Sequence, residues 1–289
     1  MRDEREMYAL ILGVAKSDER IRAVILNGSR ANPKVNHDIF QDFDIVYIVT
    51  DVDNIKNDPD WHQQFGELMI MQRPDDMHEP SPDGDGSYAY LMQLMDGNRV
   101  DLTLYPVEKL DRYQADSLSV LLLDKDGLFQ PFPPPNESDY LPKPPTAKAF
   151  ADCCNEFWWV CPYVAKGLWR REIVYAKHML DVVVRKQLMQ MLAWYVGIKT
   201  AFSSNPGKFG KHLEQHLEAE LWKMLLETYA DSEYEKNWDA LFVMTDLFRI
   251  VSVHVAEHFG FEYPYNDDEK VSAHLKHVHQ LPGDAKRMY

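Results

Sequence analysis

Two aspartates, Asp42 and Asp44, stand at the head of the apolar run Ile45–Val49. If residues 42–49 form a strand, alternate side chains point to opposite faces, so the two carboxylates face the same way. Residues 43, 45 and 47 then face the other side. Because divalent cations prefer oxygen ligands, two carboxylates placed in this way are suited to hold one such ion between them. We therefore predict that Asp42 and Asp44 bind a metal.

A glycine-serine turn precedes the acid pair. Gly28-Ser29-Arg30 follows the apolar run Ala23–Leu26, which has the composition of a strand. Glycine lets the backbone come close to a ligand, and successive N–H groups at the start of a helix bind anions. We expect this turn to open into a helix and to bind phosphate. A metal site beside a phosphate site indicates transfer of a nucleotidyl group, because attack at phosphorus needs both cations and backbone donors.

A third carboxylate, Asp101, is the single acid in the apolar run 99–105. This run and the run 88–95 are joined by Asp-Gly-Asn at residues 96–98, a strong hairpin signal. An acid inside an apolar strand is costly to bury unless it is paired or holds a metal, so we expect Asp101 to join the other two aspartates. The alternative is that Asp101 faces solvent on an edge strand while the other two cap a turn.

Charge and composition limit the partners. The 289 residues carry a formal net charge of -15. Such a surface repels nucleic acid and attracts small polycations, although on charge alone simple solubility is the stronger explanation. No apolar run approaches the roughly 18 residues of a membrane helix, and the first residues are charged, unlike a signal peptide. We expect a cytoplasmic protein with no membrane or nucleic acid partner.

Two groups of metal-ligating residue types have simpler explanations. Three cysteines without metal-finger spacing are typical of small core residues on a helix: Cys153, Cys154 and Cys161. Three histidines near the C terminus have a metal-like spacing but no accompanying frame, and we interpret them as part of a solvated tail: His274, His277 and His279.

The pattern predicts two domains separated by a proline-rich linker. Residues 130–145 hold seven prolines and show no periodicity. Residues 1–135 predict an α/β (α+β) domain with a mixed β-sheet, and residues 146–289 predict a helical bundle. The expected strands lie at 23–26, 45–49, 68–72, 88–95, 99–105 and 120–124. The expected helices lie at 3–15, 147–161, 163–196, 211–229 and 234–258.

The motifs also carry a family resemblance. GSR followed by D-x-D and a later VDLTL strand resembles the nucleotidyltransferase fold of the DNA polymerase beta superfamily. The wider sequence is similar to the aminoglycoside 6-adenylyltransferases, which inactivate streptomycin. The similarity thins after about residue 265 and is carried by DERIRAVILNGSR (18–30), FQDFDIVYIVTDV (40–52), DGNRVDLTLYP (96–106), LLDKD (122–126), DCCNEFWWV (152–160) and YVAKGLWRREI (163–173).

This resemblance implies a reaction. AMP would pass from Mg-ATP to a hydroxyl group of streptomycin, at the 6 position, with release of pyrophosphate and resistance to the antibiotic. The active site would lie between the two domains. Related enzymes use a glutamate of the helical domain as general base, which here would be Glu172, while Asp101 is the competing candidate. The alternative for Glu172 is an exposed helix acid paired with Lys177 or Arg171.

Other basic residues of the second domain have predicted roles. Lys166 and Arg170, one helical turn apart, would face together and bind the triphosphate. The spacing of Lys177, Asp181 and Arg185 predicts a stripe of salt bridges along a helix. Residues 205–211 depart from the family pattern, which is closer to GKNYK, so the roles of Lys208 and Lys211 stay open.

Two other functions fit the same residues. One is a nucleotidyltransferase that modifies a protein, a nucleic acid end or another small acceptor, and the other is a catalytically silent nucleotide-binding module. The complete set of three acids favours an enzyme, since a silent module would not need it. The choice of aminoglycoside, the number of metal ions and the oligomeric state stay open at this point.

Overall fold

The structure, a computed structural model, describes residues 1–77 and 86–289. The chain folds into two compact units, Met1–Asp139 and Tyr140–Tyr289. The dividing point lies inside the proline-rich stretch 130–145. In the described ranges, no helix has both the length and the apolar character needed to cross a membrane.

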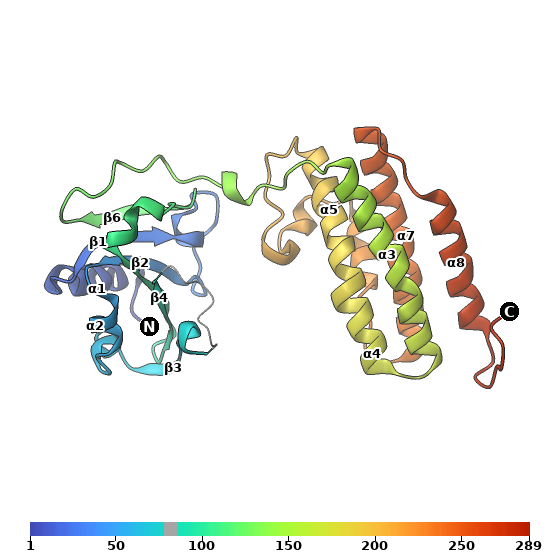
Figure 1. The fold of residues 1–289 in the computed structure, drawn as a ribbon, viewed down its shortest axis with the longest axis horizontal. Coiled ribbons are helices and arrows are strands. Elements are labelled where there is room, and N and C mark those ends of the chain that lie inside the picture. Colours follow the sequence, from blue (N-terminus) through green and yellow to red (C-terminus); the bar gives the residue numbers. More distant parts are fainter. Residues whose placement is uncertain (78–85) are drawn as a thin grey trace. The chain divides into compact units, whose positions relative to one another are not determined.

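A mixed six-stranded sheet forms the centre of the first unit (Figure 1). The strand order is β3-β4-β5-β2-β1-β6. Strands β2 and β5 pair in parallel, and every other neighbouring pair is antiparallel. The predicted fold class, a mixed sheet followed by a helical region, is confirmed. The strands are β1 (Ile21–Asn27), β2 (Phe43–Val49), β3 (Leu68–Gln72), β4 (Tyr88–Leu94), β5 (Arg99–Pro106) and β6 (Val120–Asp124).

Side-chain alternation divides the sheet into two apolar faces. One face packs against α1 (Glu4–Ser17) and buries Phe43, Ile45 and Tyr47 of β2. The even-numbered residues of β2 lie on the opposite face, where Val46 and Ile48 pack under residues 107–132. The predicted orientation of β2 is therefore confirmed, and it places Asp44 on the face away from α1.

The hairpin between β4 and β5 is also confirmed. Gly97 takes the positive φ of 89° that the turn requires, and its N–H donates to Leu94 O at 3.0 Å. Strand β5 lies between β4 and β2 in the sheet. The alternative that placed Asp101 on an edge strand is therefore wrong.

Short helical turns connect these strands. The glycine-serine turn opens into a single 3-10 turn, η1 (Gly28–Ala31), so the expected helix after it is wrong. With only four residues, η1 supplies no helix dipole of useful size. The other short elements of this unit are α2 (Val52–Lys56), η2 (Trp61–Phe65), η3 (Pro74–Asp76), η4 (Val107–Arg112) and η5 (Ser138–Tyr140).

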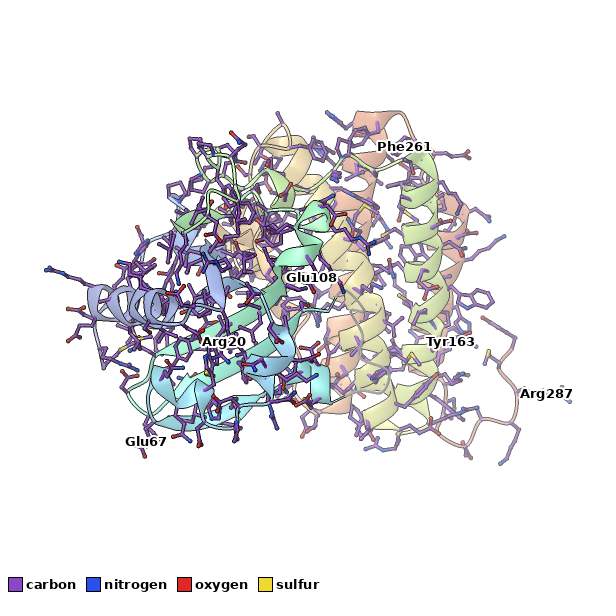
Figure 2. The ribbon with its side chains drawn as sticks, turned by 60° about the vertical axis from the view of Figure 1, so that its left-hand side comes forward. Arg20, Glu67, Glu108, Tyr163, Phe261 and Arg287 are labelled. Atoms are coloured by element: carbon purple, nitrogen blue, oxygen red, sulfur yellow. The ribbon has the colours of Figure 1, made fainter. Side chains whose placement is uncertain are left out.

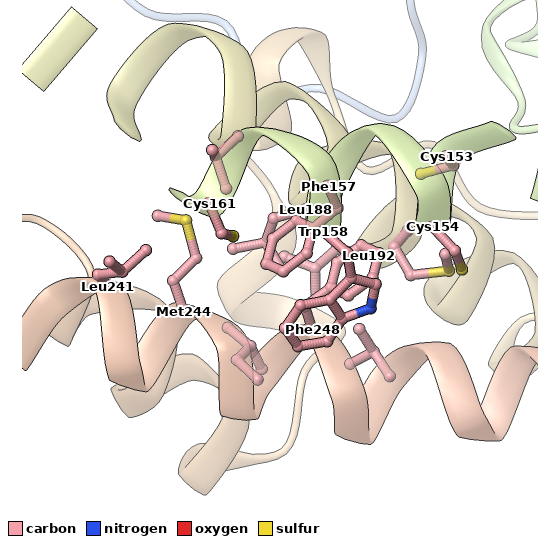
Figure 3. Packing of buried hydrophobic residues seen from close by; sticks show 14 of the residues in the cluster. Cys153, Cys154, Phe157, Trp158, Cys161, Leu188, Leu192, Leu241, Met244 and Phe248 are labelled. Atoms are coloured by element: carbon pink, nitrogen blue, oxygen red, sulfur yellow. The ribbon is translucent and has the colours of Figure 1, made fainter. Parts of the chain in front are cut away.

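The second unit is a helical bundle with its own core. Phe157 of α3 stacks on Phe248 of α7 with ring centroids 3.6 Å apart, and the three cysteines are buried, unpaired residues of α3 (Figure 3). Their interpretation as core residues is confirmed. The helices are α3 (Ala147–Trp169), α4 (Ile173–His178), the π-helix η6 (Met179–Val184), α5 (Arg185–Lys199), η7 (Lys208–Gly210), η8 (Leu213–Gln215), α6 (Ala219–Glu227), α7 (Tyr234–Phe259) and α8 (Tyr265–Gln280).

The break between the first two helices of the bundle lies later than predicted. Helix α3 continues through Pro162, because burial of Trp158 and Val164 on either side offsets the cost of an internal proline, about 3 kcal/mol. The chain turns instead at Arg171, whose φ is +60°. The predicted division into helices 147–161 and 163–196 is therefore wrong.

Two predictions for the C-terminal part are also corrected. The three histidines expected in a solvated tail lie on α8, which packs on α3 through the buried Leu275 and Val278. The predicted helix 211–229 is reduced to η8 and α6, with a loop between them. The predicted helix 234–258 is confirmed as α7.

The predicted salt-bridge stripe is confirmed and extends into the core. Asp181 binds Lys177 at 2.8 Å and Arg185 at 2.9 Å. Arg185 is 7% exposed and also donates to Thr228, to Oγ1 at 2.6 Å and to the carbonyl at 2.8 Å, while its guanidinium lies over the Tyr229 ring. This arginine therefore joins η6 and α5 to the end of α6.

We expect Arg185→Ala to lower the free energy of unfolding of the second unit by about 3 kcal/mol, because it leaves Asp181 and the Thr228 carbonyl without their buried partner. Lys223→Ala removes the exposed pair with Glu227 and should cost less than about 0.5 kcal/mol. Urea unfolding followed by tryptophan fluorescence measures both, since every tryptophan except Trp61 lies in this unit. Equal effects of the two changes would contradict the analysis.

Candidate active site

The parallel pairing of β2 with β5 brings two of the predicted site residues together. Asp44 and Asp101 are direct partners in this ladder, so their side chains leave the same face of the sheet from neighbouring strands. Asp42 precedes β2 by one residue and alternates onto the same side. The three acids, which lie far apart in the sequence, therefore share one face at one end of the sheet.

Gly28 lies directly beside Asp44. Its φ is +73°, and a Cβ atom at this position would come within 2.3 Å of Asp44 Oδ2. Glycine is therefore required for two reasons, the backbone conformation and the space taken by the carboxylate. The close approach places the backbone of the glycine-serine turn, Gly28 and Ser29, against the acid pair.

Arg99 is a member of this site that the sequence analysis missed. Its Nε and Nη2 atoms donate to the two carboxylate oxygens of Asp101, each at 2.8 Å, and its Nε lies 3.7 Å from Asp42 Oδ2. Arg99 and Asp101 are two residues apart on β5, so strand alternation puts them on the same face. That spacing was the signal available in the sequence.

Burial and neighbouring charge raise the pKa of two of these acids, Asp42 and Asp44. Burial, together with the neighbouring charges of Asp101 and Asp42, raises the pKa of Asp44 to about 6 against the opposing effect of Arg99 and Arg30. Burial also raises the pKa of Asp42, against the opposing effect of Arg99. The hydrogen bond to Asp101 raises the pKa of Arg99. Negative charge is thus in excess around Asp44.

The excess of negative charge around Asp44 favours a bound cation. In residues 1–77 and 86–289, no three His, Cys, Asp or Glu side chains are grouped closely enough to hold a metal ion as they stand. The guanidinium of Arg99 occupies both oxygens of Asp101 instead. The donor set of three carboxylates nevertheless suits Mg²⁺, because a divalent cation would offset the burial of the Asp44 charge and its repulsion by the other acids, which together raise its pKa.

Arg30 is committed to contacts within the protein. It donates to the carbonyls of Gln41 and Asp42, at 2.8 and 3.0 Å, and its guanidinium lies 3.8 Å from the centroid of the Phe43 ring. These bonds hold the segment that carries Asp42. Direct binding of phosphate by Arg30 would require some of them to break.

The remaining predicted residues belong to the second unit. Lys166 and Arg170 line a cavity of about 390 Å³ together with Tyr163 and Arg287, both labelled in Figure 2. Glu172 is exposed at the start of α4, and none of the described residues forms an ion pair with it. The proposed pairing of Glu172 with Lys177 is not observed, because Lys177 binds Asp181.

We expect Gly28→Ala to destabilise the protein more than Gly97→Ala. Both glycines have positive φ, which costs an alanine about 1 kcal/mol, but a Cβ at Gly97 meets nothing within 4 Å whereas a Cβ at Gly28 clashes with Asp44. Thermal or urea unfolding of the two variants measures the difference. Equal losses of stability would show that Gly28 and Asp44 are not in close contact.

The raised pKa of Asp44 gives a stability prediction with a definite sign. The native state holds this proton more tightly than the unfolded chain, so the contribution to stability is complete below the ordinary value of 3.8 and is lost as the pH rises through about 6. In EDTA at pH 8, Asp44→Asn should therefore raise the free energy of unfolding by about 1 kcal/mol, after allowance for partial exposure. The gain should disappear toward pH 4, and a loss of stability at pH 8 would contradict the assignment.

Comparison with known proteins identifies the family. The streptomycin adenylyltransferase family matches residues 1–278. An aminoglycoside 6-adenylyltransferase of Campylobacter jejuni is 43% identical over 95% of this chain and 95% of its own length. Similar enzymes of Bacillus subtilis (strain 168) and Staphylococcus aureus are 41% and 36% identical over 93% and 91% of this chain, and over 95% and 94% of their own lengths. With nearly its whole length matched, the chain belongs to the streptomycin adenylyltransferase family.

Proposed function

We propose that this protein transfers the adenylyl group of ATP to a hydroxyl group of streptomycin, at the 6 position, and releases pyrophosphate. Membership of the family supports the reaction, and three relatives that match almost the full chain are aminoglycoside 6-adenylyltransferases. The modified antibiotic would no longer act, so the protein would confer resistance. We place the reaction in the cytoplasm, where ATP is available.

The observation that carries the proposal is the pairing of Asp44 with Asp101 beside Gly28. Asp42, Asp44 and Asp101 would hold Mg²⁺, which when bound neutralises phosphate charge and polarises the phosphorus centre. The turn at Gly28 and Ser29 would receive the phosphates through its backbone N–H groups. Arg99 would release Asp101 as the metal binds, because the Asp101 carboxylate cannot fully bind both the guanidinium group and the metal ion.

Two residues are candidates for the general base that takes the proton of the acceptor hydroxyl. Asp101 lies within the acid group, and its carboxylate becomes available when Arg99 moves. Glu172 is an exposed carboxylate of the second unit, near Lys166 and Arg170, which would bind the triphosphate. The proton released by the hydroxyl group passes to one of them, and the leaving pyrophosphate departs in line with the attacking oxygen.

The net charge of -15 agrees with this choice of substrate. Streptomycin carries guanidinium groups, so the field of the protein attracts it and raises its rate of encounter. The same field repels nucleic acid, which disfavours a nucleic acid acceptor. Assays of pyrophosphate release with and without streptomycin distinguish the proposed reaction from transfer to a protein and from a catalytically silent role.

We expect Asp42→Asn, Asp44→Asn and Asp101→Asn each to lower kcat for formation of adenylyl-streptomycin by about 10²- to 10³-fold, because each removes a charge that stabilises the transition state. Asp53→Asn, a change of an exposed acid on α2, should leave kcat within twofold of wild type. Pyrophosphate release from Mg-ATP with and without streptomycin measures the rates, and circular dichroism confirms folding.

Two results would overturn the proposal. A wild-type protein that releases no pyrophosphate when streptomycin is added would exclude streptomycin as acceptor. Full activity of a correctly folded Asp44→Asn variant would remove the acid group from the reaction.

A further inference from the structure

Arg99 places a positive charge inside the group of acids that would hold the metal ion. It is the first residue of β5, directly after the hairpin turn, and its partner on β4 is Gln93. Strand alternation directs the Arg99 side chain onto the face that carries the three aspartates. A guanidinium group is therefore built into this face of the sheet by the register of the strands.

The carboxylates that Arg99 contacts all belong to the acid group. It donates to both oxygens of Asp101 at 2.8 Å, and its Nε atom lies 3.7 Å from Asp42 Oδ2. The charge of Asp44 also acts on it. Within residues 1–77 and 86–289, Arg99 forms no ion pair with any other carboxylate. A metal ion that binds these acids therefore competes with Arg99 for every anionic partner it has in the described part of the chain.

The side chain of Arg99 can leave the acids without disturbing the core. It is 42% exposed, whereas the side chain of Arg30, which also lies beside the acids, is 6% exposed. Arg30 is held by two backbone carbonyls and by the ring of Phe43. Arg99 makes no such contact with the residues that the structure describes. Arg30 is thus a fixed support, and Arg99 is held by charge alone.

A guanidinium group and a divalent cation exclude each other at Asp101. The bidentate pair uses both carboxylate oxygens, and the guanidinium charge would repel a cation bound beside it. With Arg99 in place, no three His, Cys, Asp or Glu side chains of the described residues stand closely enough to hold a metal ion. Displacement would cost Arg99 its charge-assisted hydrogen bonds, which water replaces only in part. A new anionic partner for Arg99 would offset that cost.

We propose that Arg99 is a displaceable counter-ion that makes metal binding at the acid group depend on phosphate binding. Without phosphate, Arg99 holds Asp101, and the acids bind a divalent cation weakly. When a polyphosphate binds, its negative charge becomes the new partner of the guanidinium group, and Asp101 is free to hold the cation. This inference rests on the proposed function for its metal and its nucleotide. Arg99 is therefore a positioning residue that couples the binding of the two.

The opposite role for Arg99 predicts the opposite result. If its hydrogen bonds held Asp101 in the orientation that binds the metal, Arg99 would support the metal site instead of competing with the metal. Removal of the guanidinium group would then weaken metal binding. The two roles therefore differ in the sign of the effect on metal affinity.

Binding of Mn²⁺ without nucleotide tests the competition, since Mn²⁺ takes the same carboxylate ligands as Mg²⁺. Electron paramagnetic resonance at pH 8 should show that Arg99→Gln binds Mn²⁺ about tenfold more tightly than the wild type. Arg99→Lys, which keeps the charge but cannot form the bidentate pair, should lie between the two. The matched control is Arg73→Gln, since the Arg73 side chain is similarly exposed, at 47%, and pairs with Asp76. It should bind Mn²⁺ as the wild type does.

A second substitution assigns the effect to the acid group. Asp101→Asn in the Arg99→Gln background should abolish the gain in Mn²⁺ affinity, because it removes the carboxylate for which the two cations compete. Thermal unfolding checks the fold of each variant. In EDTA, Arg99→Gln should unfold at a lower temperature than the wild type, since the acids lose their counter-ion. Mn²⁺ should raise its unfolding temperature by more than that of the wild type.

The dependence on phosphate is tested with α,β-methylene-ATP, which cannot transfer AMP. Calorimetry gives its affinity for each protein in Mn²⁺ and in EDTA. The ratio of the two affinities should be about tenfold larger for the wild type than for Arg99→Gln, because only the wild type has a guanidinium group to release. The complex of the analogue with Mn²⁺ in solution is common to both proteins and cancels from the comparison. Equal ratios would show that Arg99 does not couple metal binding to phosphate binding.

These measurements separate the inference from the proposed function, since none of them uses streptomycin or turnover. If the wild type adenylylates streptomycin but folded Arg99→Gln binds Mn²⁺ no more tightly than the wild type, Arg99 is not a competing counter-ion. If Arg99→Gln gains Mn²⁺ affinity through Asp101 and lowers the affinity ratio, but the wild type transfers no AMP, the role of Arg99 stands and the proposed reaction fails.

Discussion

The parallel pairing of β2 with β5 is the interaction on which the candidate active site depends. It sets Asp44 opposite Asp101 on adjacent interior strands, where both residues are half-buried. Two carboxylates in this arrangement repel each other, and burial together with this repulsion raises the pKa of Asp44. A cation is needed nearby, and Arg99 supplies one in the structure. In the folded protein the guanidinium of Arg99 therefore balances part of this negative charge.

The residues around this pair are arranged to hold it. Gly28 leaves room for the Asp44 carboxylate, and Arg30 ties down the segment that carries Asp42 by binding two of its carbonyls. Positive charge close to the acids is therefore used to support the backbone as well as to balance charge. Such support matters because a metal or a phosphate group is bound well only by donors that are already in position.

The helical unit separates charges of opposite sign along one helix. Near the C-terminal end of α3, Lys166 and Arg170 line a basic cavity, and near its N-terminal end Asp152 and Glu156 line an acidic one. A protein of net charge -15 would otherwise repel an anionic co-substrate. Charge of each sign is therefore concentrated locally at opposite ends of α3.

The sequence by itself determined the strands, the hairpin and the shared face of Asp42 and Asp44, because alternation and turn chemistry are local properties of the chain. It also identified the family, since its motifs are long and specific. Only the tertiary structure decided that Asp101 lies on an interior strand of the sheet and that the helix break falls at Arg171 and not at Pro162. These features depend on which strands become neighbours and on how much apolar surface the helices bury together, and such long-range contacts leave no periodic signal in the sequence.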